Sequence, residues 1–164
     1  MFSAKTYAAR RNMLRTKIGS GIILLPGNSL SPNNYPNNAY YFRQDSSFRY
    51  YFGLNTPSLA GLIDADTGEE ALYGDDFTVE DIIWTGPQPT LRELGAKVGI
   101  AATHPLSELE KRLRKAISLG RKIHFLPPYR GETKLWLSSL LGIKPTLLHL
   151  SLIHISEPTR LRCI

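Results

Sequence analysis

The chain has 164 residues, a hydrophobic content of 42% and a net charge of +6, which fit one globular domain with a buried core and exclude a disordered or fibrous protein. Its single cysteine, Cys163, excludes an internal disulfide framework and a cysteine-based zinc site. The longest early apolar run, residues 21–25, is too short to span a bilayer, and the N-terminus lacks the pattern of a secretory signal. We therefore expect a cytoplasmic protein without a membrane partner.

The first part of the chain predicts a helix, a buried strand and a long loop. Ser3 is placed to cap a helix that runs to about Ile18 and ends at the glycines that follow. The expected apolar stripe of this helix consists of Tyr7, Met13, Leu14 and Ile18. Residues 22–25 predict a strand. Residues 28–41 have no periodic pattern, and a functional loop and a surface excursion pinned by its tyrosines are equally good interpretations.

A short helix and a β-hairpin are expected next. Asp45 or Ser46 can cap one or two helical turns that end at Gly53. Residues 59–65 and 70–73 predict two strands, and the Asp-Thr-Gly sequence between them favours a tight turn.

Three more helices and one strand are expected after the hairpin. Thr78 can cap a short turn over residues 79–83, and Thr90 with Glu93 forms a capping box for a helix to about Val98. A longer helix to Leu119 begins either with a capping box of Ser107 and Glu110 or with Pro105 in its first turn. Its expected core face consists of Leu106, Leu109, Leu113, Ala116 and Ile117.

The last predicted elements are a strand over residues 122–126 and a helix over residues 132–141. Helices and strands thus alternate along the chain, with one hairpin between them. This order predicts an α/β fold with a mixed β-sheet flanked by helices on both faces.

Basic residues gather in two stretches, which we interpret as solvated helix faces. The first stretch contains Lys5, Arg10, Arg11, Arg15 and Lys17. The second contains Lys111, Arg112, Arg114, Lys115, Arg121 and Lys122. Glu108 and Glu110 lie four residues before Arg112 and Arg114, a spacing that supports a helix. An anion-binding face is the alternative; no nucleic-acid partner is expected.

The sequence contains no recognisable catalytic or metal-binding constellation. The four histidines, His104, His124, His149 and His154, are not spaced as metal ligands, and no nucleophile motif or phosphate-binding glycine loop occurs. Acidic residues near the turns are interpreted as turn and capping residues, namely Asp64, Asp66, Asp75 and Asp76. We therefore predict no catalytic residue and no metal ligand.

Three short motifs, in order and correctly spaced, resemble the aminopeptidase P N-terminal domain family. The first is Phe42-Arg43-Gln44-Asp45-Ser46-Ser47-Phe48 with Tyr51-Phe52-Gly53-Leu54, although the residue that many members carry between Phe52 and Gly53 is missing. The second is Leu62-Ile63-Asp64 with Gly68-Glu69, and the third is Ile83-Trp84-Thr85-Gly86. The resemblance covers residues 1–144. It points to Xaa-Pro aminopeptidases, in the group that also contains prolidase and creatinase.

The resemblance implies a parent enzyme with two domains. Its catalytic "pita-bread" domain, absent from this chain, would bind two manganese ions through two Asp, one His and two Glu, and a metal-bound hydroxide would attack the bond before proline. The N-terminal domain would help to build a homo-oligomer and would restrict the access of peptide substrates. This fragment itself is expected to bind no cofactor and to hydrolyse no peptide.

The resemblance also provides candidate site residues. Trp84 corresponds to a tryptophan that can line the active-site mouth of a neighbouring subunit, although a half-buried aromatic side chain that anchors its loop is the favoured alternative. Arg43 and Asp45 are the next candidates for lining the active site. For these two, a charge-assisted pair that braces the loop is the simpler interpretation.

The end of the chain departs from this family, and a genuine strand-like segment over residues 150–155, which are apolar and β-prone, is the less favoured interpretation. Residues 150–160 match an in-frame translation of a common transposase sequencing adapter, and residues 161–164 fit its continuation. We therefore expect residues 1–149 to be an N-terminal domain that is incomplete at its C-terminal end, and residues 150–164 to be an artefactual tail that packs poorly. The alternative for the whole chain is a free-standing interaction or anion-binding module with no peptidase half.

Overall fold

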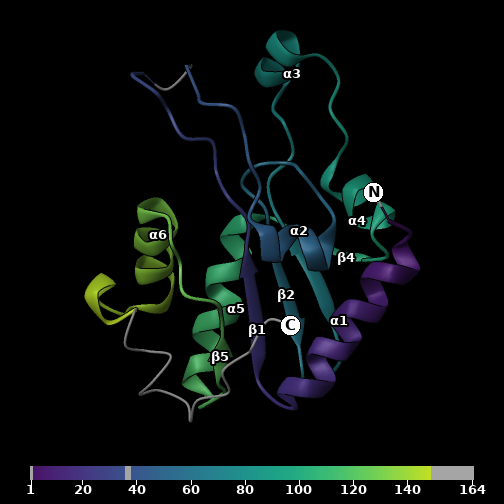
Figure 1. Ribbon diagram of the computed structural model, residues 1–164, viewed down its shortest axis with the longest axis vertical. Coiled ribbons are helices and arrows are strands. Elements are labelled where there is room, and N and C mark those ends of the chain that lie inside the picture. Colours follow the sequence, from purple (N-terminus) through teal and green to yellow (C-terminus); the bar gives the residue numbers. More distant parts are fainter. Residues whose placement is uncertain (1, 36–37, 149–164) are drawn as a thin grey trace.

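The computed structural model describes residues 2–35 and 38–148 (Figure 1). The predicted artefactual tail, residues 150–164, lies outside these ranges. No described helix is long and apolar enough to cross a membrane. The helices are α1 (Ala4–Ile18), α2 (Ser46–Phe52), α3 (Val79–Thr85), α4 (Leu91–Lys97), α5 (Leu106–Ser118), α6 (Gly131–Leu141) and the 3-10 turn η1 (Pro145–Leu147). The strands are β1 (Ile22–Pro26), β2 (Ala60–Asp64), β3 (Glu70–Tyr73), β4 (Ala102–His104) and β5 (Ile123–His124).

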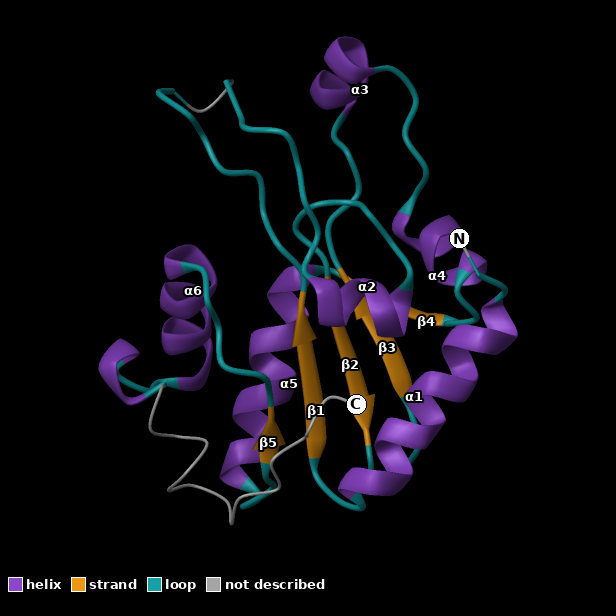
Figure 2. Cartoon of the chain, viewed as in Figure 1, coloured by secondary structure: helices purple, strands orange, loops and turns teal. Residues whose placement is uncertain are grey.

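The strands form one mixed sheet in the order β4-β3-β2-β1-β5 (Figure 2). The central pairs, β1–β2 and β2–β3, are antiparallel, and the predicted hairpin is confirmed. The outer pairs, β1–β5 and β3–β4, are parallel. The predicted mixed sheet is therefore confirmed.

Both faces of the sheet are covered by helices, as predicted. Side chains alternate along β1, so Ile23 and Leu25 join the core under α1, α2 and α4, whereas Ile22 and Leu24 join the core under α5 and α6. The same alternation continues in β2, where Ile63 faces the first group of helices. The central strands are buried on both faces, which explains why their sequences are almost continuously apolar.

Local capping signals in the sequence are confirmed at most helix ends. Ser3 caps α1 by accepting a hydrogen bond from the Thr6 backbone N–H. Asp45 caps α2 through the Phe48 N–H, and Gly53 ends that helix in the left-handed conformation. The capping box of Thr90 with Glu93 is present as well.

Two predicted helix faces were partly wrong. Met13 is 61% exposed, and the buried residues of α1 are Tyr7, Arg11 and Leu14. Arg11 is therefore not part of a solvated basic face, because its guanidinium is fully buried and donates to Glu70 and to two backbone carbonyls. On α5, Ile117 is exposed rather than part of the core face.

The start of α5 and the edges of the sheet also differ from prediction. The capping box of Ser107 with Glu110 is wrong, because α5 begins after Pro105 without a side-chain cap and Glu110 pairs with Arg114. Glu108 pairs with His104 instead of Arg112. No strand was predicted where β4 lies. The predicted strand over residues 122–126 is longer than β5, which has two residues.

A salt bridge joins the β2–β3 hairpin to the segment after α5. Asp64, buried at the end of β2, accepts hydrogen bonds from both terminal nitrogens of Arg121, at 3.0 and 2.6 Å, and from the backbone N–H groups of Asp66 and Thr67. Burial raises the pKa of the Asp64 carboxyl, but these hydrogen bonds outweigh it and hold the pKa below its ordinary value. The ion pair therefore stabilises the fold most when Asp64 is charged.

Low pH should weaken the salt bridge between Asp64 and Arg121. Because the pKa of Asp64 is lower in the folded protein, its contribution to the free energy of unfolding is fully present above the unfolded pKa, near 3.8, and is lost as the pH falls through the folded value. We expect the Asp64→Asn variant to be less stable than the wild type at pH 6 and the difference to shrink below that pKa. Urea unfolding of both proteins from pH 6 to pH 2 measures this difference. A difference that stays constant over the whole range would contradict the expectation.

Candidate interaction site

Two segments project from the same end of the sheet, beyond the ends of β1 and β3 (Figure 1). One is the loop of which residues 28–35 and 38–41 are described, and the other, residues 75–90, carries α3; we call the second segment the α3 arm. Both expose aromatic side chains, and Tyr41 in the loop is 98% exposed. This end of the molecule therefore carries large apolar groups that the described chain leaves uncovered.

The α3 arm is fixed at both ends, although no residue of its helix is buried. At its root, Asp76 accepts a hydrogen bond from the Leu91 N–H, and Asp75 accepts one from the Leu106 N–H. The helix itself begins with a capping box of Thr78 and Asp81, which confirms the predicted cap. The arm is thus a defined projection rather than an irregular loop.

The outer part of the arm is apolar and exposed. No residue of α3 is buried, and Trp84 is 83% exposed. The half-buried anchor predicted for Trp84 is therefore wrong in this chain. The exposed apolar side chains of the arm are Phe77, Val79, Ile82, Ile83 and Trp84. Such a cluster on a projecting element is typical of a surface that contacts another protein.

Gln44, in the centre of the first motif, holds the base of both the loop and α2. Its buried amide oxygen accepts from the N–H groups of Asn28 and Asp45, at 2.7 and 2.9 Å, and its amide nitrogen donates to the Thr56 carbonyl at 2.8 Å. One side chain thus satisfies three backbone groups from three segments. The sequence did not single out Gln44 by itself, because a lone glutamine gives no signal of its partners.

The structure separates the other two predicted site residues by role. Asp45 accepts the Phe48 N–H and so caps α2. Arg43 is exposed, and its backbone carbonyl accepts a hydrogen bond from the Asn28 side chain at 2.9 Å. No ion pair joins Arg43 to Asp45 among the described residues, so the predicted brace between them is absent there.

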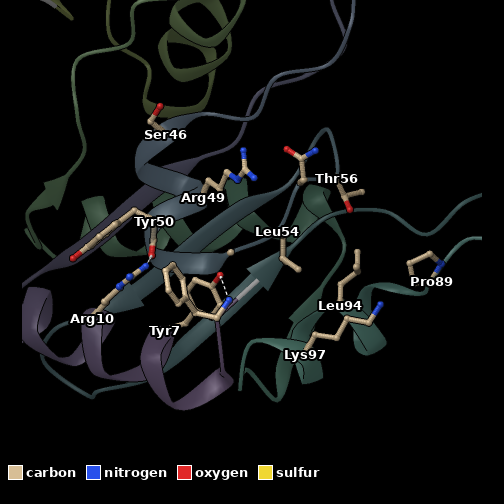
Figure 3. Close-up of a pocket in the computed structure, with 13 residues that line it drawn as sticks. Tyr7, Arg10, Ser46, Arg49, Tyr50, Leu54, Thr56, Pro89, Leu94 and Lys97 are labelled. Atoms are coloured by element: carbon tan, nitrogen blue, oxygen red, sulfur yellow. Dashed lines mark hydrogen bonds between the residues drawn. The ribbon is translucent and has the colours of Figure 1, made fainter.

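A groove of about 770 Å³ lies between α1, α2 and α4 (Figure 3). We call it the α2 groove. Its basic residues are Arg10, Arg49 and Lys97, and no carboxylate is among its described lining residues. Tyr7, Leu54 and Leu94 provide apolar surface. Sequence analysis missed this groove, because its residues come from segments that only the fold brings together.

The acidic residues near the turns are committed to structural contacts. Asp64 and Asp66 pair with Arg121, and Asp75 and Asp76 accept backbone N–H groups, in line with their interpretation as turn and capping residues. The described residues contain no group of three or more His, Cys, Asp or Glu that could hold a metal ion. The residues described here therefore do not fit the two-metal centre that the resemblance implies for the parent.

Solved structures of peptidases share this fold. Aminopeptidase P from Escherichia coli aligns with a TM-score of 0.71 and 19% identity over 87% of this chain and 33% of its own. Aminopeptidase PepP from Pseudomonas aeruginosa aligns with a TM-score of 0.72 and 19% identity over 91% of this chain and 34% of its own. The chain thus has the α/β fold of a part of these enzymes that makes up about a third of their length.

A family model identifies the family to which this fold belongs in the present chain. The family described as aminopeptidase P, N-terminal domain, matches residues 7–136. This chain belongs to that family.

Two curated relatives are much longer than the chain. Human Xaa-Pro dipeptidase is 31% identical over 65 residues, which are 40% of this chain and 13% of that protein. A Saccharomyces cerevisiae protein described as an uncharacterized peptidase is 27% identical over 111 residues, which are 68% of this chain and 21% of that protein. The chain therefore spans about a fifth or less of the curated relatives that it matches.

Proposed function

We propose that this chain is the non-catalytic N-terminal domain of a metal-dependent Xaa-Pro aminopeptidase. The parent enzyme would remove an N-terminal residue that precedes proline. Family membership and the longer peptidases that share the fold support this proposal. In it, two manganese ions belong to a catalytic domain outside this chain, and the enzyme acts in the cytoplasm.

The domain's own role, in this proposal, is to build a homo-oligomer and to limit access of peptides to the active site. The observation that carries it is the exposure of Trp84 on an arm that is fixed at its root and whose helix has no buried residue. A large apolar side chain held in this way is suited to contact with a neighbouring subunit. Trp84, with Arg43 and Asp45 as further candidates, would line the approach to the active site.

The complete reading frame provides the test. It would be recovered from the source genome, and the purified protein would be assayed on a peptide with proline in second position and on the same peptide with alanine there. We expect cleavage only of the proline peptide, with loss of activity on chelation and recovery with manganese. A natural stop codon near Lys144 would instead favour a free-standing interaction module.

Substitution on the arm tests the role of Trp84 in the complete enzyme. We expect Trp84→Ser to lower kcat/KM about tenfold or more, because a contact that orders substrate at the active-site mouth is lost. Val79→Ser is the matched control, since Val79 is an equally exposed apolar residue of the same helix. Equal activity of the two variants would contradict a role of Trp84 at the site, while leaving the peptidase assignment intact.

A further inference from the structure

The α2 groove carries positive charge that the described chain does not neutralise. Its three cations come from three helices, Arg10 from α1, Arg49 from α2 and Lys97 from α4. None of them takes part in an ion pair within the described residues, and no carboxylate is among the described residues that line the groove. A concave surface with charge of one sign attracts ligands of the opposite sign.

Aromatic rings hold Arg10 in place without removing its charge. Its guanidinium lies 4.1 Å from the ring centroid of Tyr50 and 4.7 Å from that of Phe2. It also donates a hydrogen bond to the Tyr50 backbone carbonyl at 2.9 Å (Figure 3). A guanidinium has five N–H groups, so this contact leaves donors for a ligand. Arg10 is therefore a preorganised cation, and its ordering costs a ligand little binding free energy.

The two carboxylates that directly precede groove residues in the sequence are held in helix caps. Asp45 accepts a hydrogen bond from the Phe48 N–H at the start of α2. Glu93 accepts one from the Thr90 N–H in the α4 capping box. The charge of Glu93 affects Lys97 only weakly, because the glutamate side chain is fully exposed to solvent. The positive charge of the groove is therefore available to a ligand.

Apolar surface lies between the cations. Figure 3 shows Arg10, Arg49 and Lys97 apart from one another around the groove, with the side chain of Leu54 between Arg49 and Lys97. The other apolar and aromatic lining residues include Tyr7, Pro89 and Leu94, and the uncharged polar ones are Ser46, Asn55 and Thr56. A ligand that fills the groove thus meets positive charge at its edges and apolar side chains in its centre.

The size of the groove and the spacing of its cations favour an elongated ligand. A volume of about 770 Å³ is large enough for a molecule well above the size of a single inorganic ion. One phosphate could not contact cations on different sides of the groove, and it would leave Leu54 and Leu94 uncovered. A peptide segment with carboxylates on both sides of an apolar side chain would pair with the cations and cover the leucines together. Asn55 and Thr56 could then hydrogen-bond to its backbone amides.

A single-stranded nucleic acid matches the groove less well. Bases bind to proteins largely by stacking on aromatic rings. Arg10 already lies over the rings of Phe2 and Tyr50, and the leucines between the cations are aliphatic. The lining therefore favours a peptide with carboxylates and aliphatic side chains.

We propose that the α2 groove binds an acidic peptide segment of another protein, in which carboxylates flank one or more apolar side chains. The carboxylates would pair with Arg10, Arg49 and Lys97, and the apolar side chains would lie on Leu54 and Leu94. Complementary charge guides association, and burial of the apolar groups provides most of the affinity. This inference goes beyond the proposed peptidase function and does not depend on it, because every group that it uses lies in this chain.

A series of labelled peptides tests the chemistry of the ligand. Fluorescence anisotropy would measure binding of the 164-residue chain to fluorescein-labelled Glu-Glu-Leu-Leu-Glu-Glu at low salt. We expect a dissociation constant of about 10–100 µM. The analogue with glutamine in place of every glutamate should bind about tenfold more weakly or worse. The analogue with glycine in place of both leucines should bind about fivefold more weakly or worse, because it lacks the apolar part. A labelled hexathymidylate, d(T)6, is the nucleic-acid probe.

Charge reversal tests the place of binding. Lys97→Glu and Arg49→Glu should each weaken binding of the acidic peptide about fivefold or more, because each replaces an attraction by a repulsion. Lys111→Glu is the matched control, since Lys111 is an exposed lysine of α5 on the other face of the sheet and the change in net charge is the same. It should alter the dissociation constant less than about twofold. Circular dichroism would show that each variant is folded, and Lys97→Gln, a milder change, should weaken binding in the same direction.

Four results would overturn the inference. The first is no binding of the acidic peptide. The second is an equal loss from Lys97→Glu and Lys111→Glu, which would mean that only net charge matters. The third is equal binding of the glycine analogue, which would leave a site for any anion. The fourth is tighter binding of d(T)6 than of the peptide, which would assign the groove to nucleic acid. None of these results bears on cleavage of proline peptides by the complete enzyme, so the proposed function stands or falls separately.

Discussion

Replacing Arg11 by methionine is expected to reduce the free energy of unfolding by about 3–5 kcal/mol, because it removes one partner of a buried ion pair. The Arg11 guanidinium donates to Glu70 at 2.8 Å, to the Tyr51 carbonyl at 3.1 Å and to the Val98 carbonyl at 3.0 Å. It thereby joins α1 to β3 and to the ends of α2 and α4. Methionine fills much of the volume but removes the guanidinium that donates to these three acceptors.

Urea unfolding followed by circular dichroism at pH 7 measures the effect. Lys17→Met is the matched control, because Lys17 is an exposed cation on the same helix and its replacement should change stability by less than about 0.5 kcal/mol. Arg11→Lys should fall between the two, since lysine keeps the charge but lacks the planar fork that reaches three acceptors. A loss for Arg11→Met no larger than that for Lys17→Met would refute the structural role given to Arg11.

Replacing Gly53 by alanine is expected to reduce the free energy of unfolding by about 2–5 kcal/mol, the sum of two costs. Gly53 has a φ of 68°, and a left-handed conformation costs a residue with a side chain about 1–2 kcal/mol. An added Cβ would also lie 2.1 Å from Cζ of Tyr7, so α1 or the ring must shift, at a typical overpacking cost of about 1–3 kcal/mol.

A substitution at Gly142 measures the first of these two costs by itself. It ends α6 with a φ of 67°, and nothing lies within 4 Å of an added Cβ. Gly142→Ala should therefore show the backbone cost alone. In a double-mutant cycle, Tyr7→Leu should relieve part of the Gly53→Ala cost, with a coupling of about 1 kcal/mol or more. Equal losses for the two glycine variants, with no coupling to Tyr7, would show that the close contact does not matter.

Helix ends and the central hairpin were predictable because their signals are local. Ser3, Asp45 and Thr90 are followed within three residues by the N–H groups that they cap, so the sequence contains both partners at fixed spacing. The hairpin likewise follows from two apolar segments around a tight turn. By contrast, β4 is three residues long and pairs in parallel with β3, from which α3 and α4 separate it in the chain, and its sequence has no alternation to reveal it.

Contacts between distant segments explain what the sequence could not predict. Arg11 looked like one of several basic residues on α1, because its acceptors lie 40 to 87 residues away. Trp84 was expected to be half-buried since tryptophan usually is, but no described element covers α3. The α2 groove joins residues of α1, α2 and α4, so its charge is visible only once those helices are packed.

The order of the strands has a consequence for aggregation. In the described chain, the sheet ends in its shortest strands, β4 and β5, with three and two residues, whereas β1 and β2 have five each. Short edge strands offer few unpaired backbone groups to another chain. Residues 22–25 are apolar and begin with two β-branched isoleucines, and β1 lies one position in from the edge. Detachment of β5 alone would uncover it, so partly unfolded molecules would be prone to intermolecular strand pairing well before the core has melted.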